Sequence, residues 1–419
     1  MSYDMVYFSV YIMEVNKTAR IIRSEILNPV MGFSAVFLGA VITLTYRLRY
    51  LLPGFSLQEK AAITASSTLK AILTDPMYAP HKIFQYLMGK LAHTGFIAMR
   101  SISVIMGLAV VYLFFYAARK WFSFRVSLLA TILLATSGWF VFAARSATTS
   151  IMSLSLIGVV AFGSWIINNR FHRTLLIAGF GLTLWLLYVP GLIWFVIFGT
   201  IVQRDKIREA VNRNRALSVV LLLGLFILLA PLIYTFIKNP HLLQSYFGFT
   251  TRPFTNLINF PKNLINIPLH LFIMNSSNPL RHVGRMPILD IFTSVMVVLG
   301  IYNFYVNERQ LDRVRFLLGT ISLACILIAL GGSVGIEILI PFVYLVAASG
   351  IAYLMNQWFI VFPNNPIARF LAWTMITFIV FTAAFYNLKS YFVAWARSPI
   401  TKTFYSIQPT KPAPRKIIK

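Results

Sequence analysis

Long apolar runs recur along this chain, and each is close to the roughly 20 residues that a helix needs to cross a bilayer. Hydrophobic residues make up 58% of the 419 residues, and charged residues only 11%. A membrane barrel would instead show short segments of alternating polarity. The sequence therefore predicts an all-α polytopic membrane protein.

Counting the apolar runs predicts about eleven transmembrane helices. Nine of them are expected at roughly 30–46, 101–116, 126–144, 151–167, 217–237, 291–305, 316–330, 336–354 and 371–388. The remaining stretch, 174–202, has Pro190 and Gly191 near its centre and basic residues beyond both ends. This pattern favours a tight hairpin of two short spans over one long helix.

The segments around the spans divide the chain into three parts. Residues 1–28 are expected to form a cytoplasmic or interfacial segment, 29–388 the transmembrane domain, and 389–419 a basic tail with a disordered end. Two long polar loops, about 47–100 and 238–290, separate the spans. The first is expected to hold two short amphipathic helices at the membrane surface, and the second irregular structure with short helices.

Charge indicates the orientation and the kind of ligand. The net charge is +26, from 37 Lys and Arg against 11 Asp and Glu. Basic residues in the short loops favour a cell-membrane protein with its N-terminus in the cytoplasm and its C-terminus outside. The outer loops then carry a surplus of positive charge, which fits an anionic ligand such as a phosphate. Nucleic acid is not expected as a partner, because no soluble basic patch with interleaved aromatics is present.

Four stretches follow one another in a characteristic order: LPGFSLQEKAA after the first span, the long run from HKIFQYLMGK to FAARSAT, NPLRHVGRMPILD before a later span, and FPNNPIAR after the penultimate one. In this order they resemble the GT-C superfamily of integral-membrane glycosyltransferases, in particular bacterial protein O-mannosyltransferases and aminoarabinose transferases. The resemblance covers most of the chain. It implies a GT-C-like fold and a polyprenyl-phosphate-linked sugar donor.

The resemblance also implies roles for two residues. Glu59 takes the position of the family's catalytic acid, a general base that activates the acceptor, and Arg145 takes the position of an arginine at the end of the third span. This chain departs from the family in having Gln58 where a second acid is often found. It also has no acid shortly after Arg145. From the residues alone, Glu59 could equally be a solvated carboxylate at a helix start, and Arg145 a turn residue reaching the interface.

Two basic clusters are candidates for phosphate binding. His81 and Lys82 open a helix after Pro80, where free backbone N–H groups also favour an anion. Arg281, His282 and Arg285 form a compact cluster before a span. The alternatives are an ordinary helix start for the first cluster and anchoring to lipid for the second.

The remaining acids are given structural roles. Asp290 is expected to begin a helix, Asp75 to cap or turn the chain at Asp-Pro, and Glu337 to pair with a loop arginine. No metal site and no cofactor are expected, because the six histidines are scattered and no pair of cysteines exists. The one cysteine, Cys325, cannot form a disulfide within the chain.

These features favour a membrane glycosyltransferase that transfers a hexose or pentose from a polyprenyl-phosphate donor to a lipid, protein or glycan acceptor outside the cell. The alternative is a catalytically degenerate GT-C-like protein that binds or moves lipid-phosphate ligands. A transporter of small solutes is a third possibility, but the intramembrane charges of a coupling site are nearly absent.

Overall fold

The computed structural model describes residues 28–92, 95–166, 172–249, 253–275, 278, 281–282 and 284–407. These residues form helices and turns, and the only β-type pairing among them is an isolated bridge between Phe55 and Ile407. The all-α prediction is therefore confirmed for the described part of the chain. The predicted interfacial segment 1–28 falls almost wholly outside these residues, and the end of the tail, 408–419, falls entirely outside them.

The helices follow one another in the order of the predicted spans and loops. The first half comprises α2 (Asn28–Thr45), α3 (Leu57–Ala65), α4 (Leu69–Thr74), α5 (Ala79–Ala92), α6 (Phe96–Trp121), α7 (Phe124–Thr136), α8 (Gly138–Arg145), α9 (Ile151–Leu154), α10 (Ile157–Ile166), α11 (His172–Leu187) and α12 (Ile193–Val202). The second half comprises α13 (Arg204–Arg213), α14 (Arg215–Lys238), α15 (His241–Tyr246), α16 (Pro253–Phe272), α17 (Ile291–Val306), α18 (Asp312–Ala329), the 3₁₀ turn η2 (Ile336–Leu339), α19 (Ile340–Val361), α20 (Pro366–Lys389), the π-helical turn η3 (Ser390–Trp395) and α21 (Pro399–Phe404).

Several of these helices can cross a membrane. Within the described residues, four helices are long and apolar enough, and the bent pair α7–α8 makes a fifth candidate. Each predicted span coincides with one of these, with a shorter apolar helix, or with α18. The count of eleven remains a prediction, because the shorter helices have only 10–17 residues. The expected break in 174–202 is confirmed, because α11 and α12 are separate helices joined by the turn 188–192. That each of them crosses the membrane stays a prediction.

Both long loops differ in detail from the prediction. The first loop holds three helices, α3 to α5, rather than two, because Thr68 accepts a hydrogen bond from the Ala71 N–H and so begins a separate helix α4. The second loop contains α15 and the 20-residue helix α16, which has two prolines and packs on α18. Its helical content exceeds the expected short helices because tertiary packing outweighs the local penalty of proline.

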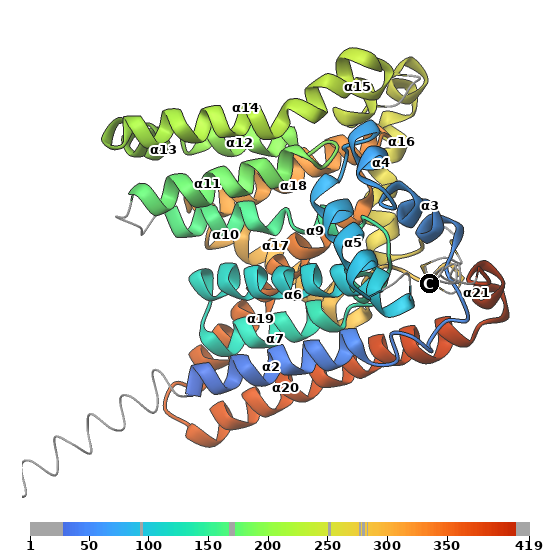
Figure 1. Cartoon of the computed structure of the whole chain (residues 1–419). Helices are drawn as coiled ribbons and strands as arrows, with labels where there is room; N and C mark the ends of the chain where they lie inside the picture. The colour runs from blue at the N-terminus through green and yellow to red at the C-terminus, as the bar shows by residue number, and fades with distance from the viewer. Residues whose placement is uncertain are drawn as a thin grey trace, which may run out of the picture.

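The two ends of the molecule are formed by different helices (Figure 1). Helices α3, α4, α5, α15 and α21 gather at one end, whereas α13 and the start of α2 lie at the other. Helix α19 lies at the centre of the core, because 83% of its apolar 18-residue stretch is buried. Helix α14 lies at the edge, where only 6% of the corresponding stretch is buried. We call the end that holds α3 to α5 the loop end.

Two irregular helix segments shape the loop end. Helices α7 and α8 meet at an angle of 61° at the pair Ser137–Gly138, a common place for a sharp kink. At the other side, α20 continues past the predicted domain boundary at 388 into η3. Both segments line the same cavity: Trp139 follows the bend, and Tyr391 and Trp395 belong to the π-helical turn.

Candidate functional site

Two adjoining cavities lie among the loops that follow α8, α16 and α20. The larger has a volume of about 480 Å³ and is lined mainly by apolar side chains from α8, the 281–290 segment, α17 and the end of α20. The smaller has a volume of about 280 Å³ and is lined mainly by polar groups from α9, α16 and the turn before α19. Trp139 and Arg281 line both cavities, so they form the boundary between an apolar chamber and a polar chamber.

Asp290 fixes one wall of the apolar chamber. It is the N-cap of α17, where its Oδ1 accepts the Thr293 N–H at 2.9 Å. Its Oδ2 accepts from the Thr293 hydroxyl at 2.7 Å and from the Asn387 amide at 3.0 Å. The prediction that Asp290 begins a helix is confirmed, and the same carboxylate ties α17 to α20.

Arg281 lies at the boundary between the chambers. It forms an ion pair with Glu337, as expected for an acid at the edge of a span. Its guanidinium lies over the rings of Trp139 and Phe142, with 5.5 Å and 5.9 Å from Cζ to the ring centroids. Its Nε is buried and has no hydrogen-bond partner among the described residues. The site therefore presents one cation, stacked on aromatic rings, to both chambers.

The other two members of the basic cluster differ in position. His282 lines the apolar chamber and stacks on Trp139 with 5.8 Å between ring centroids. Arg285 is exposed and lines neither chamber. Within this cluster, the structure therefore brings Arg281 and His282 together and leaves Arg285 aside.

Glu59 lies outside both chambers in a closed network. Arg100 donates to its two carboxylate oxygens from Nε and Nη2, each at 2.9 Å. The backbone N–H groups of Ala147 and Ser56 donate to the same oxygens at 2.8 Å and 3.2 Å. The side chain is 1% exposed. Its surroundings therefore favour a structural role, in which Glu59 joins the first loop to α6 and to the chain after α8.

Arg100 was not among the predicted site residues, although it is the ion-pair partner of Glu59. It also donates to the carbonyl oxygens of Leu48 at 3.3 Å and Gly54 at 3.1 Å, and it lies over Phe55 at 5.3 Å. An arginine at the start of an apolar run in a chain with few acids needs such a partner. That composition was the signal available in the sequence.

His81 and Lys82 are also engaged with the protein itself. His81 is fully buried, with its Nε2 at 3.0 Å from the Ser103 hydroxyl. Burial, together with the positive charge of Lys82, lowers the pKa of His81 to about 4, so the ring is neutral at pH 7. Lys82 donates at 2.7 Å to the carboxylate of Asp75, which ends α4 as the predicted cap. Neither side chain lines a chamber; their neighbour Tyr78 lines the polar one.

Arg145 supports the wall of the apolar chamber from behind. It donates to the carbonyl oxygens of Thr43 at 2.8 Å and Leu44 at 3.0 Å, near the end of α2. Its guanidinium lies over Phe392 at 4.8 Å and Tyr391 at 5.7 Å. Because Tyr391 lines the chamber, Arg145 contacts the chamber wall through this ring.

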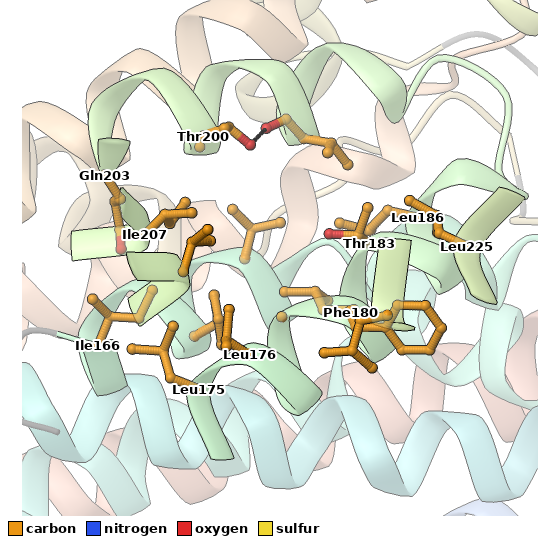
Figure 2. A pocket seen from close by; sticks show the side chains of 18 of the residues that line it. Ile166, Leu175, Leu176, Phe180, Thr183, Leu186, Thr200, Gln203, Ile207 and Leu225 are labelled. Carbon is orange, nitrogen blue, oxygen red and sulfur yellow. Dashed lines mark hydrogen bonds between the residues drawn. The ribbon is translucent and has the colours of Figure 1, made fainter. Parts of the chain in front are cut away.

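A third cavity lies away from these chambers (Figure 2). It is an apolar groove of about 260 Å³ between α10, α11, α12, α13 and α14. Gln203, Ile207 and Ile166 lie at one end of it, and Leu186 and Leu225 at the other. None of the described residues that line it is charged, so it offers no cation to a phosphate. Among the described residues, no group of three or more His, Cys, Asp or Glu is placed to hold a metal ion.

The fold and the paired chambers define a multi-pass helical membrane protein with an amphipathic cavity at one end. No family model matches the chain, and no curated protein sequence matches it. Solved structures do match: ArnT from Cupriavidus metallidurans bound to undecaprenyl phosphate has a TM-score of 0.54 at 12% identity, covering 90% of this chain and 85% of that one. ArnT in the apo state gives a TM-score of 0.53 at 12% identity, covering 90% and 78%.

The chain therefore has the fold of ArnT, a GT-C glycosyltransferase. The predicted resemblance to this superfamily is confirmed at the level of the fold.

Proposed function

We propose that this protein is a membrane glycosyltransferase that takes a sugar from a polyprenyl-phosphate donor and transfers it to an acceptor on the outer side of the cell membrane. The observation that carries the proposal is the joined pair of chambers, apolar and polar, with Arg281 between them. A lipid-linked sugar has the same order of parts: an isoprenoid chain, a phosphate and a polar sugar. The likeness to a fold that holds undecaprenyl phosphate supports this assignment.

In this proposal the isoprenoid end enters the apolar chamber and the sugar enters the polar one. Arg281 then binds the phosphate at the boundary, where its planar fork matches phosphate oxygens. The loop end faces outward. This orientation agrees with the basic helix α13 and the start of α2 lying at the opposite, cytoplasmic end.

One observation favours the second candidate, a protein that binds lipid phosphate without transferring sugar. The carboxylates of Glu59, Asp75, Asp290 and Glu337 each already have a partner. A transferase needs a carboxylate or another base that can receive the acceptor's proton. The two candidates therefore differ in whether one of these carboxylates is released during the reaction.

Arg281→Gln is expected to weaken binding of undecaprenyl phosphate by about 10- to 100-fold, since a hydrogen bond to a charged group contributes about 1.5–3 kcal/mol. Arg285→Gln is the matched control, because Arg285 lies in the same segment but lines neither chamber. It is expected to leave affinity within about twofold. Binding is measured on purified protein in lipid nanodiscs, at a temperature well below the measured unfolding temperature of each variant. Equal loss in both variants would indicate general attraction of anions and contradict the assigned site.

Transfer is measured separately with undecaprenyl phosphate that carries a radiolabelled hexose or pentose, incubated with cell-envelope extract as the source of acceptor. The proposal expects label to move from the lipid to the extract with the parent protein, and at least about 100-fold more slowly with Arg281→Gln. Binding by the parent without movement of label from any donor would favour the second candidate.

A further inference from the structure

The ion pair of Arg281 and Glu337 lies at the boundary where the proposed function places the donor's phosphate. Both residues line the polar chamber, and Arg281 lines the apolar one as well. Their side chains are 23% and 10% exposed, so the pair is largely removed from water while it borders open space. A strong charge pair in such a position either fixes the structure or changes partners when a ligand arrives.

The charges around the chambers favour a change of partners. The described residues lining them include one cation that is charged at every physiological pH, Arg281, with the two acids Asp290 and Glu337 and the histidines His270 and His282. A phosphate that approached Arg281 would come close to Glu337 as well. Two like charges repel strongly in a site of low dielectric constant, so phosphate and carboxylate cannot share Arg281 at low energy.

The Arg281 guanidinium can bind either the Glu337 carboxylate or the lipid phosphate. It lies against Trp139 and Phe142, and within the described part of the chain its buried Nε has no hydrogen-bond partner. A phosphate that forms two parallel hydrogen bonds needs two neighbouring N–H groups of such a fork. A small shift of the guanidinium across the rings would expose the Nε edge while keeping the aromatic contact.

We propose that the lipid phosphate and Glu337 compete for Arg281, and that the Glu337 carboxylate displaced by the phosphate accepts the proton of the sugar acceptor. The inference rests on the proposed function, which it deepens by naming the base. Glu337 suits this role better than the other acids. Glu59 accepts four hydrogen bonds and Asp290 three, whereas Arg281 is the one charged partner of Glu337 in the described part of the chain.

The proposed sugar transfer is a displacement at the anomeric carbon of the sugar. The acceptor hydroxyl gives its proton to the Glu337 carboxylate, and its oxygen forms the bond to the anomeric carbon. The bond from that carbon to the phosphate oxygen breaks, and its electron pair stays on the lipid phosphate. Arg281 stabilises the charge that develops there, and Glu337 then loses its proton to water and can pair with Arg281 again.

Glu337→Gln is expected to change binding and transfer in opposite directions. Affinity for undecaprenyl phosphate rises at least about fivefold, because the competing anion is gone, while transfer of labelled sugar falls at least about 100-fold with the base. Glu308→Gln is the matched control, since Glu308 pairs with Arg313 at 3.2 Å beyond the far end of α17. It is expected to change neither quantity. Glu337→Asp, which keeps the charge and shortens the side chain, provides a second variant with smaller changes of the same signs.

Unchanged or weaker binding of undecaprenyl phosphate by both Glu337 variants would overturn the competition. Transfer by Glu337→Gln at the parent rate would overturn the assignment of the base while leaving the proposed function intact. Failure of the parent to transfer any sugar would instead count against the proposed function, and the binding measurement would still decide the competition.

Discussion

Replacing Glu59 with glutamine is expected to destabilise the protein by about 3–5 kcal/mol, the usual cost of leaving one member of a buried ion pair without its partner. Arg100 would keep its charge while 3% exposed, with only neutral acceptors left in the described residues: the glutamine amide oxygen and the carbonyl oxygens of Leu48 and Gly54. Ala147 would lose a charged acceptor for its N–H, and the capping box of α3 with Ser56 would be weakened. The expected readout is a large fall in the apparent unfolding temperature of the purified protein.

Two comparisons separate this structural role from catalysis. Glu209→Gln removes an exposed pair with Arg213 and is expected to change stability by less than about 1 kcal/mol. The double variant Glu59→Gln with Arg100→Gln is expected to cost less than the sum of the two single variants, because it leaves no isolated buried charge. If Glu59→Gln instead unfolds at the parent temperature and loses sugar transfer, Glu59 is the base that the resemblance implied, and the structural role is wrong.

The course of the helices could be predicted because the bilayer leaves the chain little choice. An apolar run in hydrocarbon must pair its own backbone groups, so the length and polarity of the runs predicted the helices. Pro190, Gly191 and the flanking basic residues predicted the break at 188–192. The outer loops are not in hydrocarbon, so this requirement does not fix their structure. Helix α16 forms across Pro261 and Pro268 because contacts made only in the folded protein stabilise it. The separate helix α4 depends instead on a local N-cap, Thr68, inside a stretch that reads as one continuous helix.

The candidate site was predictable where one physical demand acts on one residue. An acid at the edge of a span needs a cation, and Glu337 has Arg281. Spacing could not identify the partner of Glu59, because Arg100 lies 41 residues away and reaches it only through the folded first loop. Trp139 was missed for a different reason. Its position depends on the bend at Ser137–Gly138, which divides a run that reads as one straight span.

Gly300 and Gly350 are where α17 and α19 touch backbone to backbone, and replacing either with alanine is expected to cost about 1–3 kcal/mol. A Cβ at Gly300 would overlap the carbonyl oxygen of Val346, and a Cβ at Gly350 would overlap that of Met296. In a membrane, small residues hold helices together by allowing such contact, here beside a hydrogen bond of 2.9 Å from Asn303 to Ser349.

The same contact should control the site, because α17 begins after Asp290 and α19 follows directly on the turn that holds Glu337. Forcing the two helices apart would move these two chamber walls relative to each other. Gly300→Ala and Gly350→Ala are therefore expected to weaken undecaprenyl phosphate binding as well as lower the unfolding temperature. Gly181→Ala on α11 is the control, since a Cβ there would meet nothing within 4 Å. Parent-like stability and binding in both glycine variants would show that the two helices can separate without cost, and that their contact does not position the chambers.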